Sequence, residues 1–120
     1  MRRSIMRPSS AKAKGRRFQQ WVASLLLEYS TGLEEDDLVS RPMGSPGEDI
    51  MQSPAARKQW PFDIECKSNK NGYTKVYDAI KQSDVRGRTP LVFFKQDREE
   101  PLIAMKAKDF VELMRKLNDS

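Results

Sequence analysis

The chain of 120 residues contains no histidine and a single cysteine, Cys66. Without an imidazole group, the protein cannot build a Ser-His-Asp or Cys-His nucleophile, a histidine-ligated zinc site, or a nuclease whose general base is histidine. A single cysteine forms no intrachain disulfide and no zinc ribbon, so nothing argues for an oxidising compartment. Any hydrolytic chemistry must therefore use carboxylates, lysine or a metal ion, and we expect a cytoplasmic protein.

Long hydrophobic runs are also missing from the sequence. The longest, from Val22 to Leu27, is interrupted by Ser24 and is far shorter than the roughly 20 residues needed to span a bilayer. The basic N-terminal end is not followed by an apolar segment, so we do not interpret it as a secretory signal. We therefore expect no membrane partner.

Basic residues are concentrated at the N-terminal end of the chain. The chain has 22 Lys and Arg against 17 Asp and Glu, a net charge of +5. Residues 1–17 hold seven of these cations and no acid, which leaves a net charge of −2 on the remainder. We expect a basic, flexible arm over 1–14 that attracts the phosphates of nucleic acid, and a single domain over 15–120. The alternative is that the arm is only a solubilising tail.

The hydrophobic pattern predicts three helices and five short strands. Apolar residues at helical spacing indicate helices that end near Ser30 and near Ser83, and a third at the C-terminal end around Phe110–Leu117. Residues 53–59 are expected to form a loop or one helical turn. Strands are expected over 38–41, 47–51, 62–67, 91–94 (a buried central strand) and 102–105. This order, α-β-β-β-α-β-β-α, implies an α/β fold in which helices flank a mixed central sheet.

Charged side chains recur at every second position of the expected strand 62–67. Asp63, Glu65 and Lys67 would project from the same face, and Asp49 lies at the head of the preceding strand. If these strands pair, Asp49 and Glu65 come within reach of one ion, and magnesium is typically held by one or two carboxylates. Lys67 would then lie beside the same phosphate and assist an attacking water. The alternative is a solvated strand face that carries no chemistry.

The Gly-Glu-Asp sequence at 47–49, followed by Phe-Asp-Ile-Glu-Cys-Lys at 62–67 in this order of elements, resembles the PD-(D/E)XK nuclease superfamily. The resemblance covers most of the chain and implies a restriction-endonuclease-like core, with 15–120 as a nuclease domain. It implies Asp49, Glu65 and Lys67 as catalytic residues. It also implies that Asp49, Glu65 and the backbone carbonyl of Cys66 bind Mg²⁺ or Mn²⁺. Asp63 would be an auxiliary acid.

The chain departs from the superfamily pattern in two places. Many resolvase-like members have a metal-binding glutamate in the first helix, where this chain has Gln19 and, near the far end, Glu28. We therefore keep Gln19 and Glu28 as auxiliary candidates. Gln82 is a third, because it resembles a glutamine that some RecB-like members place near the site. The segment between Asp49 and Glu65 is also longer than in compact members. The residues expected to contact DNA are Arg16, Arg17, Arg41, Arg57 and Lys58.

Within the superfamily, the chain resembles small phage-encoded endonucleases of the Holliday-junction-resolvase or RecB-like kind. The resemblance implies a hydrolase that cuts phosphodiester bonds in duplex, branched or single-stranded DNA during recombination or replication. The protein would act in the cytoplasm of a bacterium or a phage-infected host cell, and a homodimer would supply two active sites. The alternative is a non-catalytic nucleic-acid-binding module, or an accessory subunit, that retains the nuclease fold.

Overall fold

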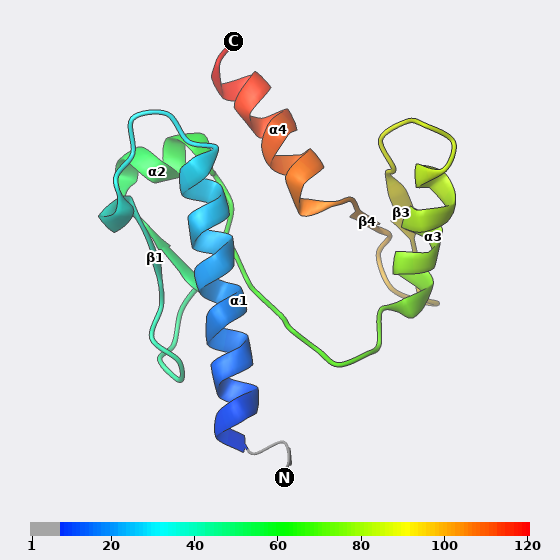
Figure 1. Ribbon diagram of the computed structural model, residues 1–120, viewed down its shortest axis with the longest axis horizontal. Coiled ribbons are helices and arrows are strands. Elements are labelled where there is room, and N and C mark those ends of the chain that lie inside the picture. Colours follow the sequence, from blue (N-terminus) through cyan, green and yellow to red (C-terminus); the bar gives the residue numbers. More distant parts are fainter. Residues whose placement is uncertain (1–7) are drawn as a thin grey trace, which may run out of the picture. The chain divides into compact units, whose positions relative to one another are not determined.

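The computed structural model describes residues 8–120, with side chains described from residue 11 onward (Figure 1). The chain divides into two compact units, Met1–Ser68 and Asn69–Ser120, here called the N-terminal and C-terminal units. The N-terminal unit contains α1 (Pro8–Glu28), a 3₁₀ turn η1 (Glu35–Asp37), β1 (Leu38–Ser40), β2 (Ile50–Gln52) and α2 (Pro54–Gln59). The C-terminal unit contains α3 (Thr74–Asp84), β3 (Val92–Phe94), β4 (Leu102–Ala104) and α4 (Ala107–Asn118).

The N-terminal unit has its core where α1 packs on β1. Apolar residues of α1 recur at helical spacing, so Leu25 and Leu26 are buried, as are Leu38 of β1 and Ile50 of β2. Trp60 follows α2 and is fully buried, and its indole Nε1 donates a hydrogen bond of 2.8 Å to Ser30 Oγ. The helix predicted at the N-terminal end is thus confirmed. It begins within the expected basic arm, since residues 8–14 belong to α1, whereas Arg2, Arg3 and Arg7 lie outside the described residues.

The strands β1 and β2 form an antiparallel pair in which Leu38 lies opposite Gln52 and Ser40 lies opposite Ile50. The predicted strand 47–51 thus starts three residues later than expected. The segment 53–59, predicted as a loop or single turn, contains α2, a helix of six residues. Ser53 caps this helix because its Oγ accepts a hydrogen bond from Ala56 N (3.1 Å), and Pro54 occupies the first helical position.

The third strand predicted over 62–67 is not part of either sheet. A strand ladder needs repeated backbone hydrogen bonds between two strands. Between the segment 62–67 and the β1–β2 hairpin, the described residues form one backbone hydrogen bond, from Asp49 N to Ile64 O (2.9 Å). Two further links use side chains: Gln52 Nε2 donates to Phe62 O (3.0 Å), and Cys66 N donates to the Asp49 carboxylate. Exposure nevertheless alternates from Asp63 to Lys67, since Asp63, Glu65 and Lys67 are exposed and Ile64 and Cys66 are half-buried, whereas Phe62 is 40% exposed.

The C-terminal unit is built from the hairpin β3–β4 and two helices, α3 and α4. The hairpin is antiparallel, with Phe93 opposite Ile103, and α3 packs against β3. The prediction that 91–94 forms a buried central strand is wrong, because Phe93 is 71% exposed and Leu91 is 49% exposed. The cause is that β3 has β4 as its only neighbouring strand among residues 8–120. Helix α4 is strongly amphipathic and buries Val111 and Met114.

Residues 8–120 therefore form a small α/β protein with four α-helices and two antiparallel sheets of two strands each. The single mixed central sheet expected from the sequence is not found in this range, because 62–67 joins no ladder and the other strands pair only within their own hairpins. The helices and the other four strands follow the predicted order. No helix between residues 8 and 120 is both long and apolar enough to cross a bilayer.

Candidate functional site

Asp49 lies immediately before β2 and is fixed by hydrogen bonds from three parts of the N-terminal unit. Its backbone N donates to Ile64 O (2.9 Å), and its backbone O accepts from Arg41 N (2.8 Å) at the end of β1. The same O accepts from the Gln19 side chain of α1 (2.9 Å). Its carboxylate oxygen Oδ2 accepts from Cys66 N at 2.6 Å. Asp49 is therefore held by both its backbone and its side chain.

Glu65 is placed beside Asp49 by the residues on either side of it. Because Ile64 and Cys66 both hydrogen-bond to Asp49, the residue between them passes directly alongside it. Burial, and then the charges of Asp49 and Glu65, raise the pKa of the Cys66 thiol to about 11. Both carboxylates thus act on the same thiol, which is kept in its neutral form. Cys66 is consequently a poor nucleophile, and its side chain is half-buried.

Lys67 and Asp63 share the exposed side of this segment with Glu65. Neither Lys67 nor Asp63 has a hydrogen bond or ion pair with another residue in the range 11–120. The ammonium group of Lys67 is therefore available to a ligand at the position two residues beyond Glu65. Because Asp49 is hydrogen-bonded to Ile64 and Cys66, the structure brings it next to the segment that carries Glu65, Cys66 and Lys67.

Gln19 positions the backbone around Asp49. It is the buried polar residue of α1, only 4% exposed. Its Nε2 lies within hydrogen-bond distance of three acceptors: Arg41 O at 2.8 Å, Asp49 O at 2.9 Å and Ser40 Oγ at 3.0 Å. An amide nitrogen facing three oxygen acceptors acts as a donor and does not ligate a cation. Gln19, kept as an auxiliary site candidate, is therefore a structural clamp on the backbone around Asp49.

The two other auxiliary candidates, Glu28 and Gln82, are both exposed on helices. Glu28 is exposed in the last turn of α1. Gln82 is exposed on α3 and belongs to the C-terminal unit.

Of the residues expected to contact DNA, three have exposed side chains that make no hydrogen bond or ion pair with another described residue: Arg16, Arg17 and Lys58. The other two converge on Glu48. Arg41 Nε donates to Glu48 O at 2.6 Å, and Arg57 Nη2 lies 2.6 Å from Glu48 Oε1. No role for Glu48 was predicted from the sequence. The signal that could have identified it is its place between the turn residue Gly47 and the candidate ligand Asp49.

The chemistry of the donors decides which ion would fit this site. Asp49 and Glu65 offer carboxylate oxygens, the backbone of Cys66 offers a carbonyl oxygen, and hard oxygen donors suit Mg²⁺ or Mn²⁺. Among residues 11–120, no three Asp, Glu or Cys side chains gather as a ligand group. Magnesium does not require such a cage, because it retains water molecules and binds substrate phosphate. The residues present therefore fit a magnesium or manganese ion held together with its substrate.

Comparison of the chain with protein-family models, with curated proteins and with solved structures gives no match. The function therefore has to be inferred from the residues themselves. These are the motif Asp49, Glu65 and Lys67 and the hydrogen bonds that bring its parts together.

Proposed function

We propose that the protein is a Mg²⁺- or Mn²⁺-dependent DNA endonuclease of the PD-(D/E)XK type, with a core related to that of restriction endonucleases. The observation that carries the proposal is the pair of hydrogen bonds between Asp49 and the segment 64–66, at 2.9 Å and 2.6 Å. They link Asp49 to the two neighbours of Glu65, which lies 16 positions later in the sequence, and Lys67 follows two residues after Glu65. Phosphodiester hydrolysis can use these groups without histidine.

Each residue of the site has a separate role in this proposal. Asp49, Glu65 and the Cys66 carbonyl would hold the divalent cation, which supplies charge stabilisation at the scissile phosphate and a more acidic water. Lys67 would orient the attacking water and neutralise negative charge that develops on the phosphate. Asp63, exposed two residues before Glu65, would be an auxiliary acid. Gln19 would hold the Asp49 backbone in place.

The proposed substrate is DNA, as duplex, single strand or branched recombination and replication intermediates such as a Holliday junction. The basic side chains of α1 and α2 support a polyanionic partner. Cutting two strands generally requires two sites, which a two-fold homodimer would provide. We infer that the protein acts in the cytoplasm of a bacterium or phage-infected cell.

A second candidate function is a non-catalytic nucleic-acid-binding module or an accessory subunit. The observation that favours it is the short bond from Cys66 N to Asp49 Oδ2, which gives that carboxylate a structural role in the absence of a cation. In this alternative, binding to DNA is sensitive to salt and indifferent to magnesium. It also survives replacement of Asp49.

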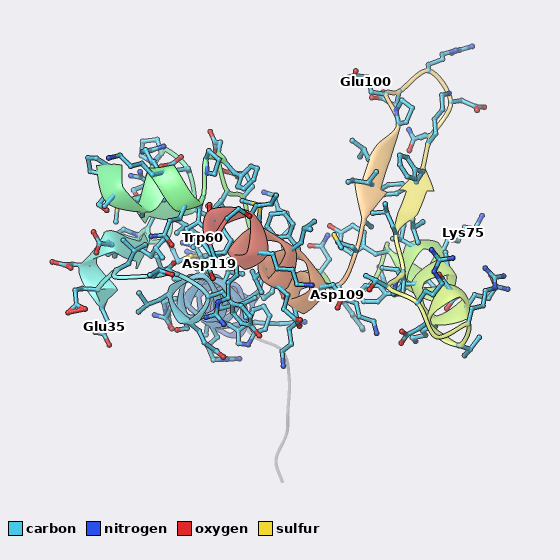
Figure 2. The ribbon with its side chains drawn as sticks, turned by 90° about the horizontal axis from the view of Figure 1, so that it is seen from above. Glu35, Trp60, Lys75, Glu100, Asp109 and Asp119 are labelled. Atoms are coloured by element: carbon cyan, nitrogen blue, oxygen red, sulfur yellow. The ribbon has the colours of Figure 1, made fainter. Side chains whose placement is uncertain are left out.

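The test is a cleavage assay on linear duplex, single-stranded, flapped and four-way DNA, with and without Mg²⁺ or Mn²⁺. We expect Lys67→Ala to reduce cleavage at least about 100-fold while DNA binding persists, because the lysine stabilises the transition state and not the fold. The matched control is Lys75→Ala, since Lys75 projects from α3 into solvent (Figure 2) and should leave cleavage unchanged.

Asp49→Asn provides a second, isosteric variant. Its amide oxygen can still accept the hydrogen bond from Cys66 N, so the fold should persist while the charge that attracts a cation is lost. Wild-type rates of metal-dependent cleavage in Lys67→Ala would exclude the proposed mechanism. If the wild-type protein cleaves no substrate in the panel yet binds DNA equally well with and without metal, the binding-module alternative is correct.

A further inference from the structure

Two arginines from different elements of the N-terminal unit converge on one residue beside the candidate metal ligands. Arg41 directly follows β1, and its Nε donates to Glu48 O at 2.6 Å. Arg57 lies on α2, and its Nη2 pairs with Glu48 Oε1 at 2.6 Å. Glu48 precedes Asp49 in the chain, so both guanidinium groups are bound to the residue adjacent to the proposed metal ligand.

Gly47 makes room for the first of these guanidinium groups. Its φ of +117° is in a region that side chains disfavour. A Cβ at this position would lie 2.7 Å from Arg41 Cζ and 2.8 Å from Arg41 Nη2. The guanidinium group therefore lies directly against the glycine backbone, and the connection between β1 and β2 is shaped around it.

Most of the hydrogen-bond donors of the two arginines are not used. A guanidinium group has five N–H donors. Within the described part of the chain, Arg41 uses only its Nε, and Arg57 uses only Nη2. The Glu48 side chain is 12% exposed, whereas the Arg57 side chain is 54% exposed. The pair therefore satisfies the covered carboxylate of Glu48 and leaves the remaining donors of Arg57 open to a ligand from solvent.

We propose that Arg41 and Arg57 form a binding site for a backbone phosphate of DNA next to Asp49 and Glu65. The planar fork of donors in arginine matches the oxygens of a phosphate. Glu48 holds both guanidinium groups in place before the substrate arrives, which reduces the entropy lost on binding. The assignment of DNA as the ligand rests on the proposed function. The phosphate chemistry rests on the geometry at Glu48.

The experiment measures binding of a fluorescent DNA duplex by anisotropy, in EDTA and over a series of salt concentrations. We expect Arg41→Gln and Arg57→Gln each to reduce the steepness of the salt dependence by about 0.9 and to weaken binding about eightfold in about 0.1 M salt, as for the loss of one phosphate contact. The control is Arg88→Gln, which removes an exposed cation of the C-terminal unit and should change neither quantity.

Gly47→Ala is the most specific variant because it keeps every charge. We expect it to weaken DNA binding to the extent that Arg41→Gln does, since the added methyl group displaces the Arg41 guanidinium group. Thermal unfolding of each variant checks its fold. If Arg41→Gln or Gly47→Ala fails to fold, Arg57→Gln decides the question, because its side chain is more than half exposed.

Two results would overturn the phosphate site. One is an unchanged affinity and salt dependence in folded Arg57→Gln, and the other is an equal loss in Arg88→Gln, which would indicate a general effect of charge. Because binding is measured without divalent metal, these outcomes are independent of cleavage. An absence of cleavage by the wild-type protein would remove the nuclease proposal and leave the phosphate site standing.

Discussion

The two units of the chain contain similar elements but hold them by different means. In the N-terminal unit, polar side chains bond to distant parts of the chain: Gln19 to Asp49 and Arg41, and Trp60 to Ser30. In the C-terminal unit, the side-chain bonds between Asn69 and Tyr73 and between Lys106 and Asp84 are exposed. The strands differ as well, since Ile50 is fully buried whereas Ile103 is 58% exposed.

The difference in burial between the two hairpins indicates what holds the residues of the candidate site in place. Each unit has one hairpin with strands of three residues, so strand length does not explain the contrast. The hairpin β1–β2 has α1 packed on it and buried side chains that reach its backbone. Such hydrogen bonds restrict the backbone around Asp49. The proposed site consists of residues of the N-terminal unit, in which the buried Gln19 fixes the backbone at Asp49.

The largest expected effect comes from truncating one isoleucine in each hairpin. Ile50→Ala should lower the free energy of unfolding by about 2–5 kcal/mol, because it leaves a cavity in a fully buried place. Ile103→Ala, the same change at an exposed strand position, should cost less than about 0.5 kcal/mol. Urea unfolding followed by circular dichroism measures both. Equal losses in the two variants would show that the contrast between the hairpins is not real.

A smaller effect is expected at the clamp that holds Asp49. Gln19→Ala should cost about 1–3 kcal/mol, because it removes a buried donor shared by three acceptors. Gln20→Ala, at the exposed neighbouring position, is the control and should change stability by less than about 0.5 kcal/mol. Urea unfolding again gives the values. If Gln19→Ala is as stable as Gln20→Ala, the clamp contributes nothing to the fold.

The smallest effect is a dependence on pH within the N-terminal unit. Asp37 accepts hydrogen bonds from Glu34 N (2.8 Å) and Ser53 Oγ (2.6 Å), which lower the pKa of its carboxyl group below the ordinary value of 3.8. A lowered pKa in the folded state stabilises the protein above that value, and the stabilisation is lost as the pH falls through the folded-state pKa. Asp37→Asn should therefore be less stable than the wild-type protein at about pH 7, and the difference should shrink toward about pH 3.

Unfolding curves across this pH range measure the effect. The control is Asp36→Asn, the exposed neighbour of Asp37 in η1, which should match the wild-type stability within about 0.5 kcal/mol at neutral pH. A difference between Asp37→Asn and the wild-type protein that stays constant with pH would contradict this role for the carboxylate.

Much of the local structure could be predicted from the sequence, and its failures have identifiable causes. Helical spacing predicted α1, α3 and α4, because an amphipathic stripe is a property of the helix itself. The alternation at 62–67 predicted the exposed face that carries Glu65 and Lys67, but not the absence of a strand ladder. A ladder needs a second strand beside the segment 62–67. The neighbouring strand β2 is short, because it ends at Gln52 and is followed by α2.

The candidate site divides in the same way. Its residue types and the two-residue spacing of Glu65 and Lys67 follow from the sequence, since neighbours along an extended chain alternate between faces. The clamp formed by Gln19 and the convergence of Arg41 and Arg57 on Glu48 could not be predicted, because these residues are 7 to 30 positions from their partners. Nothing in the local sequence specifies such contacts.

By itself, the sequence determined the chemistry available to this protein: carboxylates, one thiol, lysine and arginine, with no imidazole. It also determined the helices and the face on which Glu65 lies, because both depend on the periodicity of a single segment. Only the tertiary structure decided that Asp49 meets the segment 64–66 and that two arginines are held beside it. The physical reason is that hydrogen bonds between distant residues depend on the tertiary packing that brings their donors and acceptors together.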